Sequence, residues 1–504
     1  MARYLRGAML ALTAAGLLLT GCGAGSENSA TDSSDNSGGG YHPAPAPDSG
    51  EYDQDDGESS REVAPSPDHL STFALDVDTA SYGYARRTLA EGRLPDPSTI
   101  RPEEFVNSFR QDYDRPDGDG FSVTVDGART NREDWSLVRV GLATRAAADE
   151  EERPPAALTF VIDISGSMSE EGRLDLAQES LGVMTDRLRN DDSIAIVTFS
   201  DEAETVLPMT RLGENRDDIH EAIDSLEPTL STNLGAGVET GYATAVEGLR
   251  EGATNRVVLI SDALANTGDT DADTILERVA GARQEYGITL FGVGVGSDYG
   301  DALMERLADK GDGNTVYVSG EEEANQVFSE QLPRNIDLTA RDAKAQVAFD
   351  PETVEEFRLI GYDNRQVADE DFRDDSVDGG ETGPGHTVTA LYAVRTTPNA
   401  EGRLATATVR WQDPNSRTPH EESGQLETDS LDDSIWSAGP RFQVTATAAY
   451  FADALRRGDD RWDSLPGAPG LSELGDRADE LAEATQDKAV DELSEAIDQA
   501  ERLT

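Results

Sequence analysis

The stretch that decides the fold is Leu158-Thr159-Phe160-Val161-Ile162, followed directly by Asp163-Ile164-Ser165-Gly166-Ser167. Its first five residues form a short apolar run, which is typical of a strand buried on both faces of a parallel sheet. Three oxygen-bearing side chains then follow at alternate positions, and Gly166 allows the chain to turn tightly between them. The stretch therefore predicts a buried strand that ends in a polar loop.

Apolar runs alternate with helical patterns on both sides of this strand, from Leu158 to Phe328. Apolar side chains recur at helical spacing from Leu174 to Leu188, and again around Ile219–Leu226, Val238–Leu249, Ile275–Ala282 and Leu303–Leu307. Further buried strands are predicted at Ser193–Phe199, Arg256–Ile260, Ile288–Val293 and Thr315–Val318. Repeated strand–helix units predict an α/β fold of the doubly wound, Rossmann-like class, with a mostly parallel sheet and helices on both faces.

Polar side chains also follow a second strand and occupy one loop. Asp262 comes directly after Ile260-Ser261, and Thr232 lies in the loop Leu230–Gly235. Ligands of such sheets bind at the carboxyl ends of the strands, where the strand order reverses. Oxygen ligands without His or Cys suit Mg²⁺, or Ca²⁺ or Mn²⁺, better than zinc or copper. We predict a metal site made of Asp163, Ser165, Ser167, Thr232 and Asp262; the alternative is that the hydroxyl groups cap helices and Asp163 merely ends a strand.

This constellation resembles the metal-ion-dependent adhesion site (MIDAS) of von Willebrand factor A (VWA) domains, over residues 155–333, here called the central domain. The resemblance implies that Ser165, Ser167 and Thr232 offer hydroxyl oxygens and that Asp163 and Asp262 supply charge. It also implies an open coordination position that takes a Glu or Asp carboxylate from a protein ligand. Many VWA domains have Gly after the last Asp, whereas Ala263 stands here. No basic residue is expected beside the ligands.

Composition limits the possible partners. The chain has 504 residues, with 100 Asp and Glu against 42 Lys and Arg, so its formal net charge is −58. Such a charge excludes nucleic acid as the main partner, because a phosphate backbone requires basic surfaces. The only cysteine is Cys22, which excludes an intrachain disulfide and a cysteine-based metal cage.

The N-terminus predicts the location. Residues 1–21 combine two arginines with a short apolar run, as a secretory signal does. Leu19-Thr20-Gly21-Cys22 resembles the lipobox of bacterial lipoproteins, which implies lipidation of Cys22 and an extracytoplasmic protein anchored to the cell membrane. The alternative is an ordinary signal peptide with a chance cysteine. Residues 22–70, rich in Ser, Gly, Pro and Asp, are predicted to form a disordered tether.

The flanking segments are expected to form one β-rich domain into which the central domain is inserted. The N-terminal flank (71–150) predicts a helix up to about Glu91 and strands near Phe121–Val125 and Trp135–Leu142. The C-terminal flank (338–433) predicts strands at Ala343–Phe349, His386–Arg395 and Ala405–Trp411, and residues 434–504 are predicted to be helical at Phe442–Leu455 and Leu471–Ala500. The apolar stripe of Leu471–Leu481 is expected to pack on this domain rather than bind a partner. The acidic run Asp369–Asp378 lacks EF-hand spacing and is interpreted as a solvated loop.

The order of the segments resembles a family of bacterial surface lipoproteins with a VWA domain between family-specific extensions, over roughly residues 70–460. The first functional hypothesis is an adhesion or scaffold lipoprotein that binds a protein ligand through a divalent cation. The second is an assembly factor for an envelope complex. A metal-assisted hydrolase is the third, but the chain has no His-Glu-x-x-His, Gly-x-Ser-x-Gly or Gly-x-x-x-x-Gly-Lys motif. We therefore expect no enzymatic activity.

Overall fold

The computed structural model describes residues 69–504, apart from 76, 133, 147–152, 171–172, 263–271, 296–303, 305–306, 308–314, 319, 321–323, 325–326, 329–337, 376, 378, 415 and 457–463. The predicted signal sequence, Cys22 and nearly all of the predicted tether lie outside these residues, as does most of the helix predicted at Leu303–Leu307. Within the described part of the chain, every helix is too short or too polar to cross a membrane.

The central domain is built on a six-stranded sheet with the strand order β6-β5-β4-β7-β8-β9. All neighbouring strands pair in parallel except β6, which is antiparallel to β5 at the edge of the sheet. This arrangement confirms the predicted mostly parallel α/β fold. The strands are β4 (Ala156–Asp163), β5 (Ser193–Phe199), β6 (Ala203–Arg211), β7 (Thr254–Ser261), β8 (Thr289–Val295) and β9 (Thr315–Val318).

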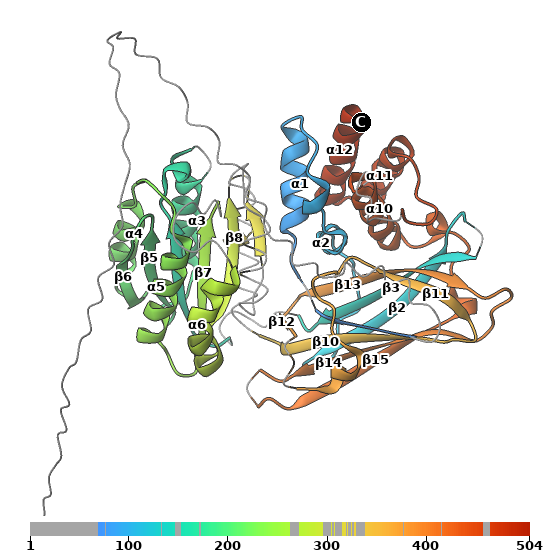
Figure 1. Ribbon diagram of the computed structural model, residues 1–504, viewed down its shortest axis with the longest axis horizontal. Coiled ribbons are helices and arrows are strands. Elements are labelled where there is room, and N and C mark those ends of the chain that lie inside the picture. Colours follow the sequence, from blue (N-terminus) through green and yellow to red (C-terminus); the bar gives the residue numbers. More distant parts are fainter. Residues whose placement is uncertain are drawn as a thin grey trace, which may run out of the picture. The chain divides into compact units, whose positions relative to one another are not determined.

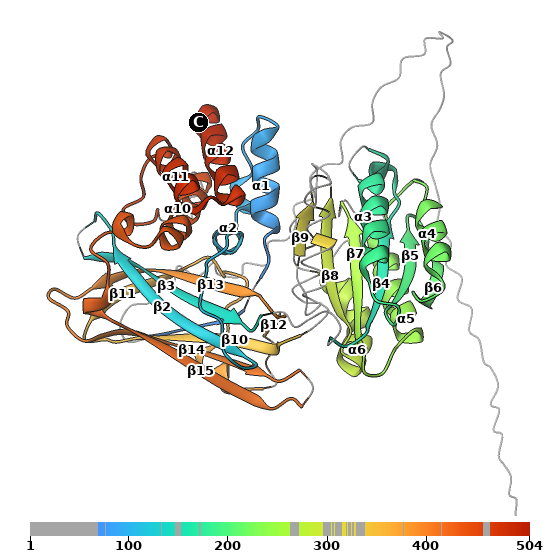
Figure 2. The same ribbon diagram turned by 180° about the vertical axis from the view of Figure 1, so that it is seen from behind.

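Helices cover both faces of this sheet (Figures 1 and 2). Phe160 and Val161 are neighbours in β4 and point to opposite faces, because side chains alternate along a strand. Phe160 belongs to the same apolar cluster as residues of α3 and α4, whereas Val161 packs with residues of α5 and α6. The helices are α3 (Leu174–Arg187), α4 (Arg216–Asp224), α5 (Leu234–Glu247) and α6 (Ala272–Tyr286).

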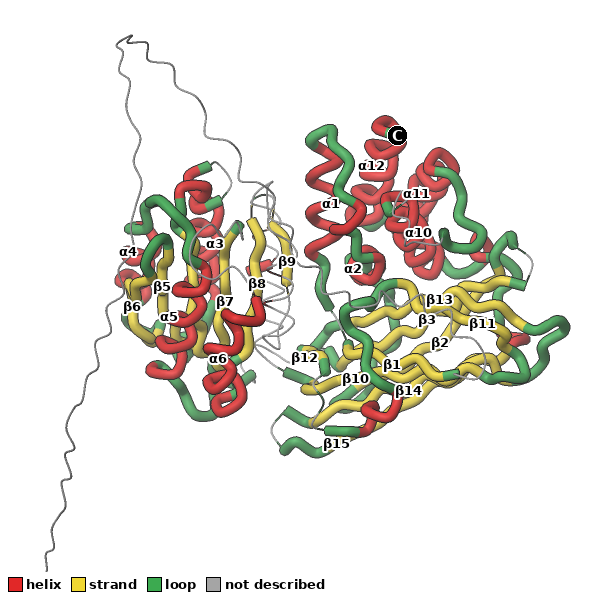
Figure 3. The backbone as a smooth tube through the Cα atoms, in the orientation of Figure 1, coloured by secondary structure: helices red, strands yellow, loops and turns green. Residues whose placement is uncertain are grey.

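Strands from both flanking segments pair with one another in two further sheets (Figure 3). One has the order β1-β10-β14-β15, with β12 also paired to β10, and the other has the order β11-β13-β3-β2. Because β1–β3 precede the central domain and β10–β15 follow it, the flanks share one β-rich unit, as expected. The strands are β1 (Leu70–Ala74), β2 (Phe121–Arg129), β3 (Trp135–Thr144), β10 (Ala340–Phe349), β11 (Val354–Ile360), β12 (Gly380–Thr382), β13 (Thr387–Thr396), β14 (Arg403–Gln412) and β15 (Pro419–Glu427).

The second of these sheets is buried on both faces. In β13, Tyr392 packs between the two sheets, whereas Leu391 packs against helices on the other side. These helices come from both ends of the described chain, and all of them contribute to one apolar cluster. They are α1 (Ala80–Ala90), α2 (Pro102–Asn107), α10 (Pro440–Leu455), α11 (Leu471–Thr485) and α12 (Lys488–Leu503).

The helical segment predicted at Leu471–Ala500 is broken in the structure. Gln486 takes a left-handed backbone conformation (φ 50°) that ends α11, and the Asp487 side chain caps α12 by accepting a hydrogen bond from the Ala489 N–H at 3.1 Å. An Asp at this position favours a new helix start over a continuous helix. The break lets α11 and α12 pack side by side, and Leu474 and Ala478 of the predicted stripe are fully buried in the shared apolar cluster.

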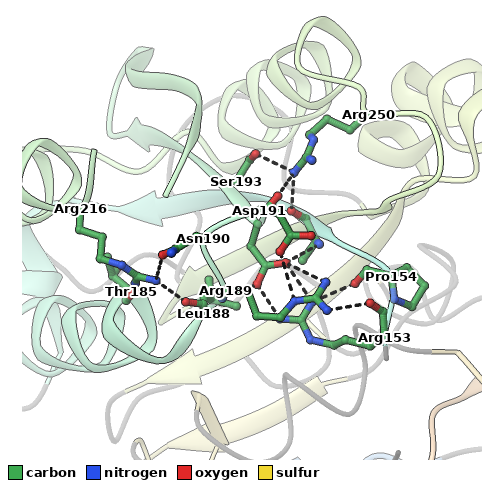
Figure 4. A network of polar contacts seen from close by, with 12 residues as sticks. Arg153, Pro154, Thr185, Leu188, Arg189, Asn190, Asp191, Ser193, Arg216 and Arg250 are labelled. Carbon is green, nitrogen blue, oxygen red and sulfur yellow. Dashed lines mark hydrogen bonds and ion pairs between the residues drawn. The ribbon is translucent and has the colours of Figure 1, made fainter. Parts of the chain in front are cut away.

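A polar network fixes the amino ends of β4 and β5. The Asp192 carboxylate, which is fully buried just before β5, accepts hydrogen bonds from the Ala156 N–H of β4 at 2.8 Å and from the Arg153 guanidinium at 2.9 Å. On the same turn, Arg250 donates to the Ser193 hydroxyl at 2.9 Å. Figure 4 shows Arg153, Arg189 and Arg250 converging on this turn. The network lies at the opposite ends of the strands from the predicted metal site.

Candidate metal centre

Strand β4 positions Asp163 at the point where the strand order reverses. β4 lies between β5 and β7 and pairs in parallel with both. The chain leaves β4 to form β5 on one side and returns later to form β7 on the other. Such a reversal leaves a crevice at the carboxyl ends of the central strands. Asp163 is the last residue of β4, and Asp262 directly follows β7, so both carboxylates lie at this edge.

The Asp163 carboxylate is held by groups from two strands. Its Oδ1 accepts a hydrogen bond from the Ser165 N–H at 2.8 Å, and its Oδ2 accepts one from the Ser261 hydroxyl at 2.6 Å. The side chain is fully buried. Its position is therefore fixed both by its own loop and by the end of β7.

The loop after β4 brings two hydroxyl groups together. The Ser165 and Ser167 oxygens lie 3.1 Å apart, with Ser165 buried and Ser167 partly exposed. Gly166 stands between them at the start of a short 3₁₀ turn (Gly166–Ser169). A Cβ at Gly166 would lie 3.4 Å from the Thr229 carbonyl oxygen, which is an ordinary contact distance, so the Thr232 loop packs directly against this turn.

Backbone hydrogen bonds join the Thr232 loop to the other loops. The Thr229 N–H donates to the Ile164 carbonyl and the Asn233 N–H donates to the Ser200 carbonyl, both at 2.6 Å. Thr232 is 1% exposed. A backbone hydrogen bond thus links the Thr232 loop to the loop that follows Asp163. Within the latter loop, hydrogen bonds that involve the side chains link Asp163 to Ser165 and Ser165 to Ser167.

Asp262 is paired with a buried arginine. Its Oδ2 accepts a hydrogen bond from Nη1 of Arg173 at 2.7 Å, and Nη2 of the same guanidinium contacts Oε2 of Glu170 at 2.8 Å. The Arg173 side chain is 3% exposed and the Asp262 side chain is fully buried. The expectation that no basic residue lies beside the predicted ligands is therefore wrong, because Arg173, which directly precedes α3, places its guanidinium against the second carboxylate.

Electrostatics at the centre favour the binding of a cation. Burial raises the pKa of Asp163 to about 6, and the nearby Asp262 charge adds to this rise, while hydrogen bonds from Ser261 and Ser165 oppose it. Both effects that raise the pKa penalise the negative charge of Asp163. A divalent cation beside the carboxylate removes that penalty. At pH 7 the group is mostly ionised and can act as a ligand.

The donor set fits a hard cation. Among the described residues, no three His, Cys, Asp or Glu side chains are gathered closely enough to hold a metal ion by themselves. A cation here would therefore need the hydroxyl oxygens as well as the two carboxylates. Such an all-oxygen set suits Mg²⁺, Ca²⁺ or Mn²⁺. The assignment of the five residues as ligands stays a prediction.

Sequence reasoning missed one exposed apolar residue at this edge. Leu230 is 79% exposed, although it lies only two residues from buried Thr232. Ser231 between them adopts a left-handed backbone (φ 66°), which is uncommon for a residue other than glycine. The Leu230 Cδ2 atom lies 4.0 Å from the position of a Cβ at Gly166. A leucine within a polar loop was the only signal in the sequence.

Comparison with known proteins agrees with the fold. The family model for the von Willebrand factor type A domain matches residues 157–331. Two further models match the flanks, "von Willebrand factor" at residues 47–139 and "Uncharacterized protein YfbK, C-terminal" at residues 335–465. The chain therefore contains a VWA domain between YfbK-like N- and C-terminal regions. VWA domains typically mediate protein–protein interactions and commonly bind divalent cations at a MIDAS.

The chain is homologous to "Uncharacterized protein YfbK" of Escherichia coli (strain K12), with 39% identity over 356 residues, which are 69% of this chain and 61% of that protein. It is 28% identical over 204 residues to "Uncharacterized protein sll0103" of Synechocystis, covering 40% of this chain and 47% of that protein. The chain thus spans about three fifths and one half of the length of these relatives. Among solved structures, a von Willebrand factor type A protein from Catenulispora acidiphila is similar with a TM-score of 0.47 and 17% identity, covering 76% of this chain and 91% of that one.

Proposed function

We propose that this chain is a bacterial cell-envelope lipoprotein whose central domain binds a protein ligand through a divalent cation, in an adhesion or scaffolding role. One observation carries the proposal. Two buried carboxylates, Asp163 and Asp262, lie with buried hydroxyl groups at the carboxyl ends of adjacent parallel strands. A bound cation supplies an open coordination position for a carboxylate of the partner.

The charge of the chain explains why the contact needs a cation. With a net charge of −58, the chain repels an acidic partner. A divalent cation at the carboxyl ends of β4 and β7 gives the partner's Glu or Asp a local positive charge to bind. The partner is therefore expected to present a carboxylate, and removal of the cation is expected to weaken the contact.

Leu230 extends this surface beyond the cation. Its exposed side chain lies next to the loop that carries Ser165 and Ser167, and the hydrogen bond from the Thr229 N–H to the Ile164 carbonyl holds the Leu230 loop in place. Buried apolar side chains at an interface contribute much of the binding energy. We infer that the partner places an apolar contact beside its carboxylate, which makes the contact more specific than a carboxylate alone would.

Calorimetric titration of Mg²⁺, Mn²⁺ and Ca²⁺ into the protein tests the metal centre. Asp163→Asn keeps the size of the side chain but removes its charge, and we expect the dissociation constant to rise by at least about a hundredfold, because even outer groups of metal sites change affinity ten- to a hundredfold. The control is Asp224→Asn, at an exposed carboxylate at the end of α4 in the same domain. Equal metal affinity for the two variants would contradict the proposal.

The anchor is tested separately. A single lipid chain binds membranes only marginally, whereas two or more chains anchor a protein stably. We expect the native chain to fractionate with membranes and Cys22→Ala to move to the soluble fraction. Mass spectrometry of the mature N-terminus should find the lipid on Cys22. An unmodified Cys22 in a membrane-bound chain would rule out this anchor.

A further inference from the structure

We propose that Arg173 is a built-in cation of the metal centre, which lowers the affinity for the divalent ion and gives the loaded centre a net positive charge that selects a carboxylate ligand. This inference rests on the proposed function of the same site. It concerns a residue that the five predicted ligands do not include. It follows from the direct pairing of Arg173 with Asp262 inside the protein.

The pairing is fixed by local structure. Arg173 directly precedes α3, and its backbone N–H donates to the Asp175 carboxylate at 2.9 Å, which holds the start of the helix. From there the guanidinium reaches Asp262, 89 residues further along the chain, at 2.7 Å. Both side chains are almost fully buried, so water screens their interaction weakly. The guanidinium therefore contributes a fixed charge to the centre.

Arg173 competes with a metal ion for the same carboxylate. A guanidinium stays charged at all relevant pH values, so it cannot yield its place by losing a proton. While Arg173 stays paired with Asp262, an approaching metal ion finds Oδ2 already engaged by the guanidinium. If the guanidinium moves aside, its positive charge remains close to the metal ion. Both situations reduce its affinity, in the same way that a neighbouring positive charge reduces the proton affinity of a carboxyl group.

The same charge changes what the loaded centre attracts. Asp163 and Asp262 carry two negative charges and Arg173 carries one positive charge, so the empty centre has a net charge of about −1. A divalent cation brings it to about +1, whereas without Arg173 the loaded centre would be about neutral. Glu170 pairs with the same guanidinium, but its side chain is 66% exposed and its charge is largely solvated. Arg173 therefore makes the loaded centre attractive to an anion.

The two effects predict opposite changes in one variant. In Arg173→Gln, metal binding should become tighter, because the competing charge is gone, while binding of a carboxylate to the loaded centre should become weaker. An adjacent charge changes the proton affinity of a carboxyl group by about ten- to a thousandfold, so we expect the Mg²⁺ dissociation constant to fall by at least about tenfold. A purely structural role for Arg173 would weaken both interactions.

The test uses calorimetry on the full chain with two probes, Mg²⁺ alone and then acetate added to the Mg²⁺-saturated protein. Arg173→Lys keeps the charge and should stay closer to the native protein than Arg173→Gln. The control Arg187→Gln changes the same residue type at the exposed end of α3 and should leave both affinities unchanged. Tighter Mg²⁺ binding with weaker acetate binding in Arg173→Gln supports the inference; unchanged or weaker Mg²⁺ binding overturns it.

Two further outcomes are distinguishable. If the native protein and Asp163→Asn fail equally to bind Mg²⁺, the proposed function fails rather than the role of Arg173. If Arg173→Gln does not fold, Arg173→Met replaces it, because methionine fills a similar volume without charge or hydrogen-bond donors. Failure of both variants to fold, as seen by circular dichroism, overturns the inference and assigns Arg173 a structural role.

Discussion

We expect one added methyl group at Gly241 to loosen the packing of α5 on β4 beside the candidate metal centre. A Cβ at this position of α5 would lie 2.3 Å from Cγ2 of Val161, far inside the contact distance of about 3.5 Å between carbon atoms. Val161 is fully buried in the central strand β4, two residues before Asp163, so it has little room to move. Helix α5, which begins two residues after Thr232, must move away from the sheet instead.

The size of the effect follows from two opposing contributions to the free energy of unfolding. Overpacking costs about 1–3 kcal/mol, and an approach as close as 2.3 Å lies in the upper part of that range, at about 2–3 kcal/mol. Alanine returns about 1 kcal/mol because it favours the helix more than glycine does. The net loss in the free energy of unfolding for Gly241→Ala is then roughly 1–2 kcal/mol. This is about a five- to thirtyfold change in the equilibrium between the folded central domain and its unfolded state. Displacement of Thr232 should also weaken Mg²⁺ binding.

Native-state hydrogen exchange measured by mass spectrometry is the appropriate assay. The four tryptophans lie at 135, 411, 436 and 462, outside the central domain, so their fluorescence does not report on it directly. Peptides from β4 and β5 should exchange about five- to thirtyfold faster in Gly241→Ala. The matched control is Gly281→Ala in α6, where a Cβ has no neighbour within 4 Å and exchange should slow or stay the same. Equal exchange in the two variants would refute the packing argument.

Two more changes separate stability from ligand binding. Burial alone would raise the pKa of Asp192, but hydrogen bonds from Arg153 and the Ala156 N–H outweigh it and hold this pKa below its usual range. A carboxylate with a lowered folded-state pKa stabilises the protein above its unfolded-state pKa, and the contribution is lost as the pH falls through the folded-state value. Asp192→Asn should therefore lower the free energy of unfolding, measured by urea denaturation, most at pH 7, and its difference from the native protein should shrink below about pH 4. A difference that does not depend on pH would contradict this. Leu230→Ala should leave the Mg²⁺ affinity unchanged. It should reduce several-fold the amount of envelope protein that the Mg²⁺-loaded chain retains and that EDTA releases. Equal retention by the native chain and the variant would count against Leu230 as a contact.

The buried strands of the central domain could be predicted because their sequences carry the signal. β4, β5 and β8 are buried throughout, as is most of β7, so each appears as an apolar run. Strand β6 was missed, because most of its residues are exposed and its pairing with β5 depends on backbone hydrogen bonds. Strand β15 was missed for the same reason, since its first five residues are all exposed. Edge strands of this kind leave little periodicity in a sequence.

The candidate site could be predicted only in part. Asp163, Ser165 and Ser167 alternate in the chain directly after a predicted strand, and this spacing predicts that they lie together. Asp262 directly follows another predicted strand, which places it at the same edge of the sheet. Arg173 carries no such signal, because its contact with Asp262 spans 89 residues and depends on where α3 begins. An arginine ahead of a helix is also compatible with an exposed side chain. Its role follows only from the folded geometry.

The salt dependence of partner binding should distinguish the buried charges of the candidate site from the exposed acidic residues around it. Asp201 and Glu202 follow β5 and Glu227 precedes Leu230, and all three are exposed near the loops of the candidate site. Their repulsion of an acidic partner is screened at physiological ionic strength beyond about 8 Å, whereas contacts at the buried centre are screened much less. Adding NaCl from 0.05 M to 0.3 M at saturating Mg²⁺ should therefore strengthen the retention of an acidic partner, unlike an ordinary exposed ion pair. Retention that falls steadily with salt would show that exposed charges, and not the buried centre, hold the partner.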